Sequence, residues 1–290
     1  GRFSFSTNQG GHTPPGGFLC QQTYLADQEM VRIMDSQALE RAAIILSGGR
    51  LEHIRLDHLP EAHRPQNEAE AYQLQAAVRR RLSIAGYGEP VGRKIGCTTT
   101  VMQEYLKIAN PCAGLVYAPT VRERTGEFDF SSFLRVGVEC EIVVRLSDDL
   151  PASGAPYTRF TVSPAVQAVM CGIEIVDDRW VDYGSMDVAT LIADDFFGAG
   201  CVLGDPVMAW RELELELLTG SMSINGVQVG SGVGGDIMGH PLEALYTAAG
   251  GRIRLPRKYR RDEMVETRRP SGDRYIWTGI RISAVHLKID

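Results

Sequence analysis

The chain has 290 residues, of which 44% are hydrophobic and 23% charged, so its composition is that of a globular enzyme and excludes a disordered or fibrous protein. Its 36 acidic and 30 basic residues give a formal net charge of −6, which argues against a dedicated nucleic-acid-binding protein. No segment reaches the roughly 18 uninterrupted apolar residues of a membrane span, so we expect no membrane association.

The N-terminal segment lacks the apolar stretch of a secretory signal, and we expect residues 1–17 to form a flexible tail. The six cysteines are scattered along the chain without a CxxC pair. Scattered cysteines of this kind are typical of reduced thiols, so we expect a cytoplasmic protein.

Two helices are predicted before the first strand. Apolar residues recur at helical spacing over 27–46, and Ser47-Gly48-Gly49 is expected to end that helix. A second helix is predicted to begin near Asn67, with Glu70 as a capping-box partner, and to stop at Gly86. We therefore expect residues 18–88 to form a small N-terminal helical lobe.

From about residue 91 the pattern changes to short strands separated by turns. Asn225-Gly226 is the residue pair that a two-residue hairpin turn favours, and Ser163-Pro164 predicts the start of a helix. The expected elements are strands at 91–98, 135–144, 172–176 and 280–287, a hairpin over 222–229, and helices at 163–170 and 240–249. Strands that do not alternate regularly with helices favour an α+β fold over a parallel βαβ repeat.

The most informative local pattern is Glu139-Cys140-Glu141. On a strand, residues two apart project from the same face, and two carboxylates in a segment of Val, Ile and Cys are costly to leave unpaired. Glu174 lies in a second apolar strand. A hard divalent cation such as Mg²⁺ or Mn²⁺, which prefers oxygen ligands, would offset the cost of three such acids. The alternative is that Glu139 and Glu141 lie on the solvated face of an amphipathic strand.

Lysine is rare in this chain, which otherwise uses arginine. The lysines are Lys94, Lys107, Lys258 and Lys288. Lys94 lies in a glycine-flanked predicted strand, where a compact ammonium that transfers protons is one interpretation. The alternative is a surface lysine at a strand edge.

Five segments follow one another in a recognisable order. They are 92–98 (GRKIGCT) with Met102-Gln103, the ExE motif 139–141, 173–179 (IEIVDDR), 193–195 (ADD), and 232–242, which ends in MGHPL. Together they resemble the hydratase/decarboxylase branch of the fumarylacetoacetate hydrolase superfamily, typified by 2-keto-4-pentenoate hydratase and 4-oxalocrotonate decarboxylase. The resemblance extends over about residues 27–250.

That resemblance implies a mixed β-roll catalytic domain over 89–290, preceded by the helical lobe. It implies a Mg²⁺ or Mn²⁺ site at Glu139, Glu141 and Glu174, with Lys94 as the catalytic residue. The substrate-binding residues that it implies are Thr98, Asp194, Phe196, Phe197, Gly239 and His240. The implied partner is a small carboxylate substrate, and we expect a homo-oligomer.

The chain departs from the branch at positions that shape the chemistry. Cys112 stands where the branch commonly has an aspartate implicated in proton transfer, and the segment 116–120 lacks the usual acid. Phe196 and Phe197 replace small and hydroxyl residues. We therefore expect a metal-dependent lyase acting on a short 2-oxo or 2-hydroxydienoate carboxylate, by hydration or by decarboxylation. The alternatives are a C–C hydrolase of the acylpyruvate type, a non-catalytic relative that keeps the metal site, and a likeness of fold alone.

Overall fold

The computed structural model describes residues 33–108, 110–151, 154–246 and 274–280. The predicted tail 1–17, the first residues of the predicted helix at 27–46 and nearly all of the predicted strand at 280–287 lie outside these ranges. No helix in the described ranges has the length and apolar character to cross a membrane.

Within the described ranges, the core is a seven-stranded sheet with the strand order β2-β1-β9-β4-β5-β6-β3. The pairs β1/β9 and β3/β6 are parallel, whereas β1/β2, β4/β9, β4/β5 and β5/β6 are antiparallel. The strands are β1 (Pro90–Gly96), β2 (Cys112–Tyr117), β3 (Val121–Glu123), β4 (Val136–Leu146), β5 (Val166–Asp177), β6 (Gly198–Leu203) and β9 (Arg274–Ile280). This mixed sheet with its helices confirms the α+β fold class.

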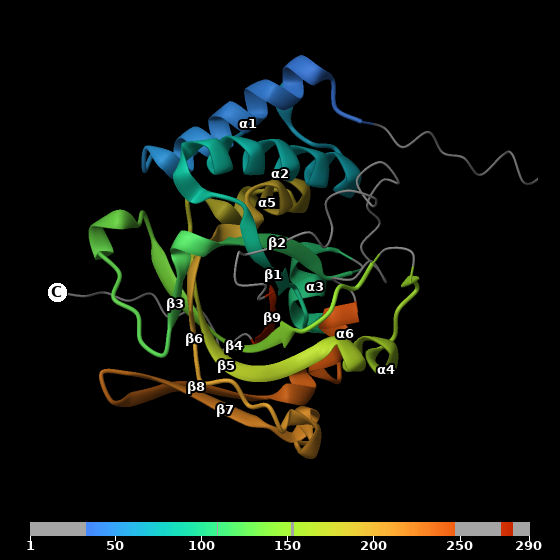
Figure 1. Ribbon diagram of the computed structural model, residues 1–290. Coiled ribbons are helices and arrows are strands. Elements are labelled where there is room, and N and C mark those ends of the chain that lie inside the picture. The colour runs from blue at the N-terminus through green and yellow to red at the C-terminus, as the bar shows by residue number, and fades with distance from the viewer. Residues whose placement is uncertain (1–32, 109, 152–153, 247–273, 281–290) are drawn as a thin grey trace, which may run out of the picture. The chain divides into compact units, whose positions relative to one another are not determined.

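Of the two N-terminal helices, the second, α2 (Glu68–Leu82), packs on the first and on α5 (Val188–Ala193), and Figure 1 shows both helices above strands β1 and β2. Tyr72 Oη accepts a hydrogen bond from the backbone N–H of Ala113 at 2.9 Å, and Gln75 Nε2 donates to the Ala113 and Ile192 carbonyls at 2.8 Å. These buried bonds fix the second helix against β2 and α5. The β-roll form of the sheet, a separate helical lobe and the domain boundary at residue 88 remain predictions.

The first of these helices, α1 (Ser36–Leu51), ends later than we predicted. Asp35 caps it by accepting from the backbone N–H groups of Gln37 and Ala38. Gly48 and Gly49 lie inside its last turns instead of ending it. A Cβ on Gly49 would come within 2.9 Å of the Leu56 side chain, so this glycine permits close packing.

The second helix, α2 (Glu68–Leu82), confirms the predicted start. Asn67 Oδ1 accepts from the Glu70 N–H at 2.9 Å, and Glu70 Oε2 accepts from the N–H of Gln66 at 2.8 Å. A wider π turn, Ser83–Tyr87, follows the helix. Asn67 therefore caps the helix as predicted, whereas the Glu70 side chain accepts from Gln66, one residue before the N-cap position of a capping box.

The predicted helix at 163–170 is wrong. Ser163–Ala165 forms a single 3₁₀ turn, and β5 begins at Val166. From Val166 onward the chain pairs with β4 along its length, Val169 opposite Val144 among the pairs. Strand pairing of buried β-branched residues has overridden the local Ser-Pro preference for a helix start.

The predicted hairpin is confirmed. Strands β7 (Thr219–Ile224) and β8 (Val227–Val233) form a separate two-stranded sheet. Asn225 and Gly226 have φ of 51° and 79°, the positive values that a type I′ turn requires at both central positions. The remaining α-helices among the described residues are α3 (Thr100–Leu106), α4 (Arg159–Val162) and α6 (Pro241–Tyr246), and α6 lies within the predicted range 240–249, whose last residues are outside the described part of the chain.

Candidate active site

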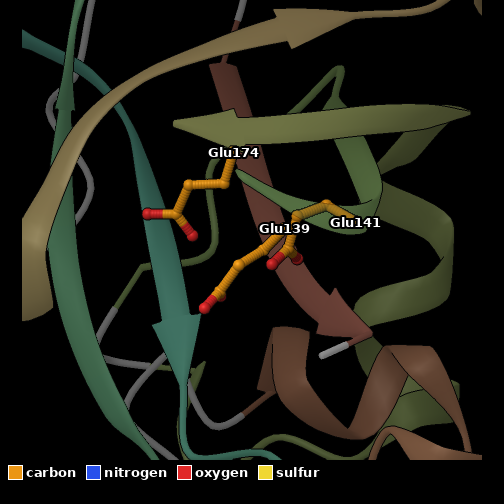
Figure 2. Close-up of side chains that lie close together, drawn as sticks. All are labelled: Glu139, Glu141 and Glu174. Atoms are coloured by element: carbon orange, nitrogen blue, oxygen red, sulfur yellow. The ribbon is translucent and has the colours of Figure 1, made fainter. Parts of the chain in front are cut away.

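Three glutamates from two neighbouring strands form one acidic cluster. In the antiparallel register of β4 and β5, Glu139 lies directly opposite Glu174, and Glu141 is two residues further along the same face. One oxygen from each carboxylate lies within 4.8 Å of the others, and Figure 2 shows the three groups turned toward a common space. Glu141 is only 3% exposed and Glu139 is half-buried, so the alternative of a solvated strand face is wrong for Glu141; Glu174 is 5% exposed.

Burial and mutual repulsion make these carboxylates unfavourable as bare anions. The pKa of Glu141 is raised well above its usual value, first by burial and then by the neighbouring Glu174 and Glu139. Burial likewise raises the pKa of Glu174 to about 7 against the attraction of Lys94. Glu141 Oε2 is buried and has no hydrogen-bond partner within the described ranges. A buried carboxylate oxygen without a partner is what a metal ion would satisfy.

Lys94 lies in β1 with β2 on one side and β9 on the other, and it is 5% exposed. The alternative of a surface lysine at a strand edge is therefore wrong. Its Nζ donates to Glu174 Oε1 at 2.5 Å and to the carbonyl oxygen of Phe196 at 2.9 Å. Burial opposes the charged ammonium, but attraction to Glu174, Glu139 and Glu141 outweighs it and raises the pKa of Lys94.

The Phe196 carbonyl reaches Lys94 because the backbone takes a left-handed path. Asp195, Phe196 and Phe197 have φ of 55°, 45° and 65°, a region that residues with a side chain seldom occupy. The Asp195 carboxylate holds the start of this segment. Its Oδ1 accepts from the Leu115 N–H at 3.1 Å, and its Oδ2 accepts from Arg50 Nη1 at 3.2 Å.

Two buried arginines fix the residue before this segment. Arg50 Nη2 and Arg179 Nη2 both donate to the Asp194 carbonyl, at 3.1 and 2.9 Å. Arg179 Nε also donates to Asp194 Oδ2 at 3.1 Å. Asp194, which we expected to bind substrate, is 1% exposed and does not line the cavity beside the acidic cluster. Its bonds to the arginines hold the backbone that leads into the left-handed segment.

The sequence did not single out Arg50, Arg179 or Asp195 as members of the site. Arg50 is separated from Asp195 by 145 residues, and only the packing of α1 against the turn brings them together. The pattern at 173–179 contained Arg179 without indicating its partner.

Substitution of Arg50 should destabilise the folded chain. We expect Arg50→Met to lower the free energy of unfolding by about 3–5 kcal/mol, because Asp195 then stays buried without its counter-ion. Urea unfolding followed by circular dichroism measures the change. Arg124→Met is the matched control, since the Arg124–Asp205 pair is exposed on both sides and should contribute little. Equal effects of the two substitutions would contradict the supporting role of Arg50.

The acidic cluster and Lys94 open into a cavity of about 430 Å³, a size typical of small-molecule sites. Its walls are largely apolar. They comprise Ile95, Gly96, Cys97, Thr98, Thr99, Met102, Tyr105, Leu106, Val176, Tyr183, Leu191, Phe196 and Phe197. A second cavity, of about 450 Å³, is lined by Lys94 and Glu174 but not by Glu139 or Glu141. A ligand on a metal held by all three acids would therefore occupy the first cavity.

Among the expected substrate-binding residues, Thr98, Phe196 and Phe197 line this first cavity. Gly239 and His240 do not line it. His240 Nδ1 accepts from the Leu242 N–H at 3.1 Å at the start of α6, and its Nε2 lies 3.5 Å from Glu216 Oε2. The turn containing them reaches the site indirectly, since the Met238 N–H donates to the Thr98 carbonyl at 3.1 Å.

Comparisons with known proteins identify relatives of this chain. No family model matches the chain. A 2-keto-4-pentenoate hydratase from Paraburkholderia xenovorans (strain LB400) is 30% identical over 200 residues, covering 69% of this chain and 72% of the relative. A 4-oxalocrotonate decarboxylase from Pseudomonas putida is 24% identical over 216 residues, covering 72% and 80%.

Among solved structures, the 4-oxalocrotonate decarboxylase from Pseudomonas putida G7, complexed with magnesium and adipate, has a similar fold. It superposes with a TM-score of 0.74 at 22% identity, covering 88% of this chain and 92% of that one. This likeness establishes a shared fold along most of the chain.

Proposed function

Since the chain belongs to the hydratase/decarboxylase branch of the fumarylacetoacetate hydrolase superfamily, we propose that it is a divalent-metal-dependent lyase acting on a short 2-oxo or 2-hydroxydienoate carboxylate. The observation that carries this proposal is the cluster of Glu139, Glu141 and Glu174 beside the buried Lys94. Relatives with both reactions, hydration and decarboxylation, support the lyase class.

Glu139, Glu141 and Glu174 would hold Mg²⁺ or Mn²⁺, since three carboxylates with one unpartnered oxygen fit a hard cation. The decarboxylase of similar fold is complexed with magnesium. When bound, the cation supplies Lewis-acid stabilisation of negative charge that develops on the substrate's 2-oxygen.

Lys94 would complete this stabilisation and move a proton. Its Nζ is held by Glu174 and by the Phe196 carbonyl, so it is oriented before substrate arrives. During ketonisation of a dienol it would donate a hydrogen bond to the developing oxygen anion or transfer a proton to the carbon chain. Phe196 and Phe197 would exclude water from the tail of the substrate.

The residue at position 112 favours decarboxylation over hydration. Cys112, in place of the branch's aspartate, is buried in β2 and provides no carboxylate to activate water. Loss of CO₂ requires an electron sink but no activated water. A C–C hydrolase would also need a water-activating group.

An ultraviolet assay with Mg²⁺ or Mn²⁺ tests the proposal directly. Loss of the conjugated chromophore from a panel of 2-hydroxydienoates and 4-oxalocrotonate-like diacids, abolished by a chelator, is the expected result. Purified, metal-loaded chain that consumes none of the panel would favour the non-catalytic relative. The proposal includes a cytoplasmic homo-oligomer, which size-exclusion chromatography with light scattering tests for assembly.

Metal affinity should depend on pH. Because the pKa of Glu174 is raised to about 7, a proton occupies this carboxyl at lower pH and competes with the metal. We expect Mn²⁺ to bind more tightly as the pH rises through about 7, as measured by isothermal titration calorimetry.

The stability of the metal-free chain should show the opposite trend. A raised folded-state pKa contributes stability that is fully present below the unfolded value of 4.5 and is lost as the pH rises through about 7. The melting temperature of the metal-free chain should therefore fall over this range, and Mn²⁺ should restore it most at high pH. Glu174→Gln should flatten the dependence, and an unchanged profile in that variant would assign it to other groups.

A further inference from the structure

The second cavity, of about 450 Å³, is large enough for a small molecule and has no part in the chemistry proposed above. His53 and Arg122 in its lining are exposed, so the cavity reaches the surface. Lys94 and Glu174 lie at its buried part, each 5% exposed. Because Glu139 and Glu141 do not line it, this cavity is a separate space next to the metal site.

Two side chains that line this cavity carry a buried polar atom without a hydrogen-bond partner in the described ranges. The atoms are the phenolic oxygen of Tyr117, which is 2% exposed, and Nε of Arg50, which is 8% exposed. Burial and Asp195 raise the pKa of Tyr117, and the Arg50 guanidinium opposes this rise, so the two side chains are close enough to interact. A buried O–H and a buried N–H without an acceptor are both costly, and a bound acceptor would remove that cost.

The buried charges of the lining are already compensated. Asp177 accepts from the backbone N–H groups of Leu134 and Arg135, both at 2.8 Å. The other buried charges form the ion pairs Arg50–Asp195, Arg179–Asp194 and Lys94–Glu174. Since each buried cation of this lining has a counter-charge, the cavity favours a neutral acceptor over an anion, which would stay unpaired.

Aromatic rings supply much of the remaining lining. The rings of Tyr87 and Tyr117 meet edge to face with 5.4 Å between centroids, and those of Phe128 and Phe133 are tilted at 6.3 Å. Rings in such arrangements can contact a flat aromatic molecule through their faces and edges. A carbonyl oxygen has two lone pairs and can accept from Tyr117 and Arg50 together.

We propose that the second cavity is a binding site for a neutral aromatic carbonyl compound, whose oxygen accepts hydrogen bonds from Tyr117 Oη and Arg50 Nε. The ring of the compound packs against the aromatic side chains of the lining. The site is distinct from the place of the metal and its substrate, and it exists whether or not the chain is a lyase.

Benzamide and benzoate are matched probes, because they have nearly the same shape and differ in charge. Ligand-observed NMR titrations use the full chain with Mg²⁺ and saturating oxalate, which occupies the open positions of the metal in the first cavity. We expect benzamide to bind with a Kd of about a millimolar or tighter, and benzoate to bind at least about fivefold more weakly. Cyclohexanecarboxamide, which keeps the acceptor but lacks the aromatic ring, should also bind severalfold more weakly.

Three outcomes of these titrations would overturn the inference. Benzamide that does not bind would exclude the site. Benzoate that binds as tightly as benzamide would make it a site for anions. Cyclohexanecarboxamide that binds as tightly would remove the role of the aromatic lining.

Tyr117→Phe locates the ligand, because it removes the hydroxyl and keeps the ring. The Kd of benzamide should rise by about fivefold or more in this variant. Phe197→Leu is the control, since Phe197 lines the first cavity and not the second, and it should change this Kd by less than about twofold. An unchanged Kd in Tyr117→Phe, or an equal rise in Phe197→Leu, would contradict binding in the second cavity.

Thermal unfolding of the chain without benzamide tests whether the Tyr117 hydroxyl is free to bind a ligand. Tyr117→Phe should keep or raise the melting temperature, because the hydroxyl has no partner within the described residues. Tyr72→Phe is the matched control. Tyr72 Oη accepts from the Ala113 N–H at 2.9 Å, so its loss should lower the melting temperature by about 2–4 °C. An equal fall in both variants would mean that the Tyr117 hydroxyl is already bonded, and it would overturn the inference.

Discussion

Lys94→Met should lower kcat by about a thousandfold while Mn²⁺ still binds. Methionine retains much of the buried volume but cannot donate to the substrate oxygen or move a proton. The metal ligands keep their positions on β4 and β5, and removal of the ammonium leaves more negative charge for the cation. Steady-state kinetics on the dienol substrate and Mn²⁺ titration of the same preparation measure the two quantities.

Lys107→Asn is the matched lysine control. Lys107 is exposed at the end of α3 with φ of 56°, a conformation that asparagine tolerates. This variant should retain kcat within about a factor of two. If Lys94→Met turned over substrate at a comparable rate, Lys94 would have no part in the chemistry.

Glu141→Gln should weaken Mn²⁺ binding by about a hundredfold or more. The substitution retains size and replaces the unpartnered carboxylate oxygen with a neutral amide, a poorer ligand for a hard cation. Calorimetric or electron-paramagnetic titration of Mn²⁺ measures the loss. Activity should fall in parallel at limiting metal and recover in part at high metal concentration.

Glu104→Gln separates ligation from a general charge effect. Glu104 is exposed on α3, the helix that also lines the cavity. Its substitution by glutamine removes one negative charge and leaves the three clustered glutamates in place. We expect its Mn²⁺ affinity to stay within about threefold of the unsubstituted chain. Glu141→Gln with the same Mn²⁺ affinity as Glu104→Gln would contradict the assignment of Glu141 as a ligand.

Local patterns predicted the acidic part of the site well. Alternation on a strand placed Glu139 and Glu141 on one face, and the scarcity of lysine drew attention to Lys94. The structure supplied what spacing alone lacked, the antiparallel register that sets Glu174 opposite Glu139. Cap residues at Asn67 and turn residues at 225–226 were equally readable, because their preferences are local.

The failures came where distant contacts decide. Residues 166–170 pair with β4, and that pairing outweighs the Ser163-Pro164 preference for a helix start. The role of Arg50 depends on a partner 145 residues away. Neither fact is encoded within one turn of helix or one strand, so no local pattern could reveal it.

The left-handed segment of Asp195, Phe196 and Phe197 links the orientation of Lys94 to the aromatic lining of the cavity. Each of these residues pays about 1–2 kcal/mol for a conformation that glycine adopts freely. Glycine there would relax the backbone. It would also shift the Phe196 carbonyl that accepts from Lys94, and it would remove aromatic side chains that line the cavity. Broader substrate range is therefore more accessible through changes on α3, where Tyr105 and Leu106 can be altered while the orientation of the lysine is preserved.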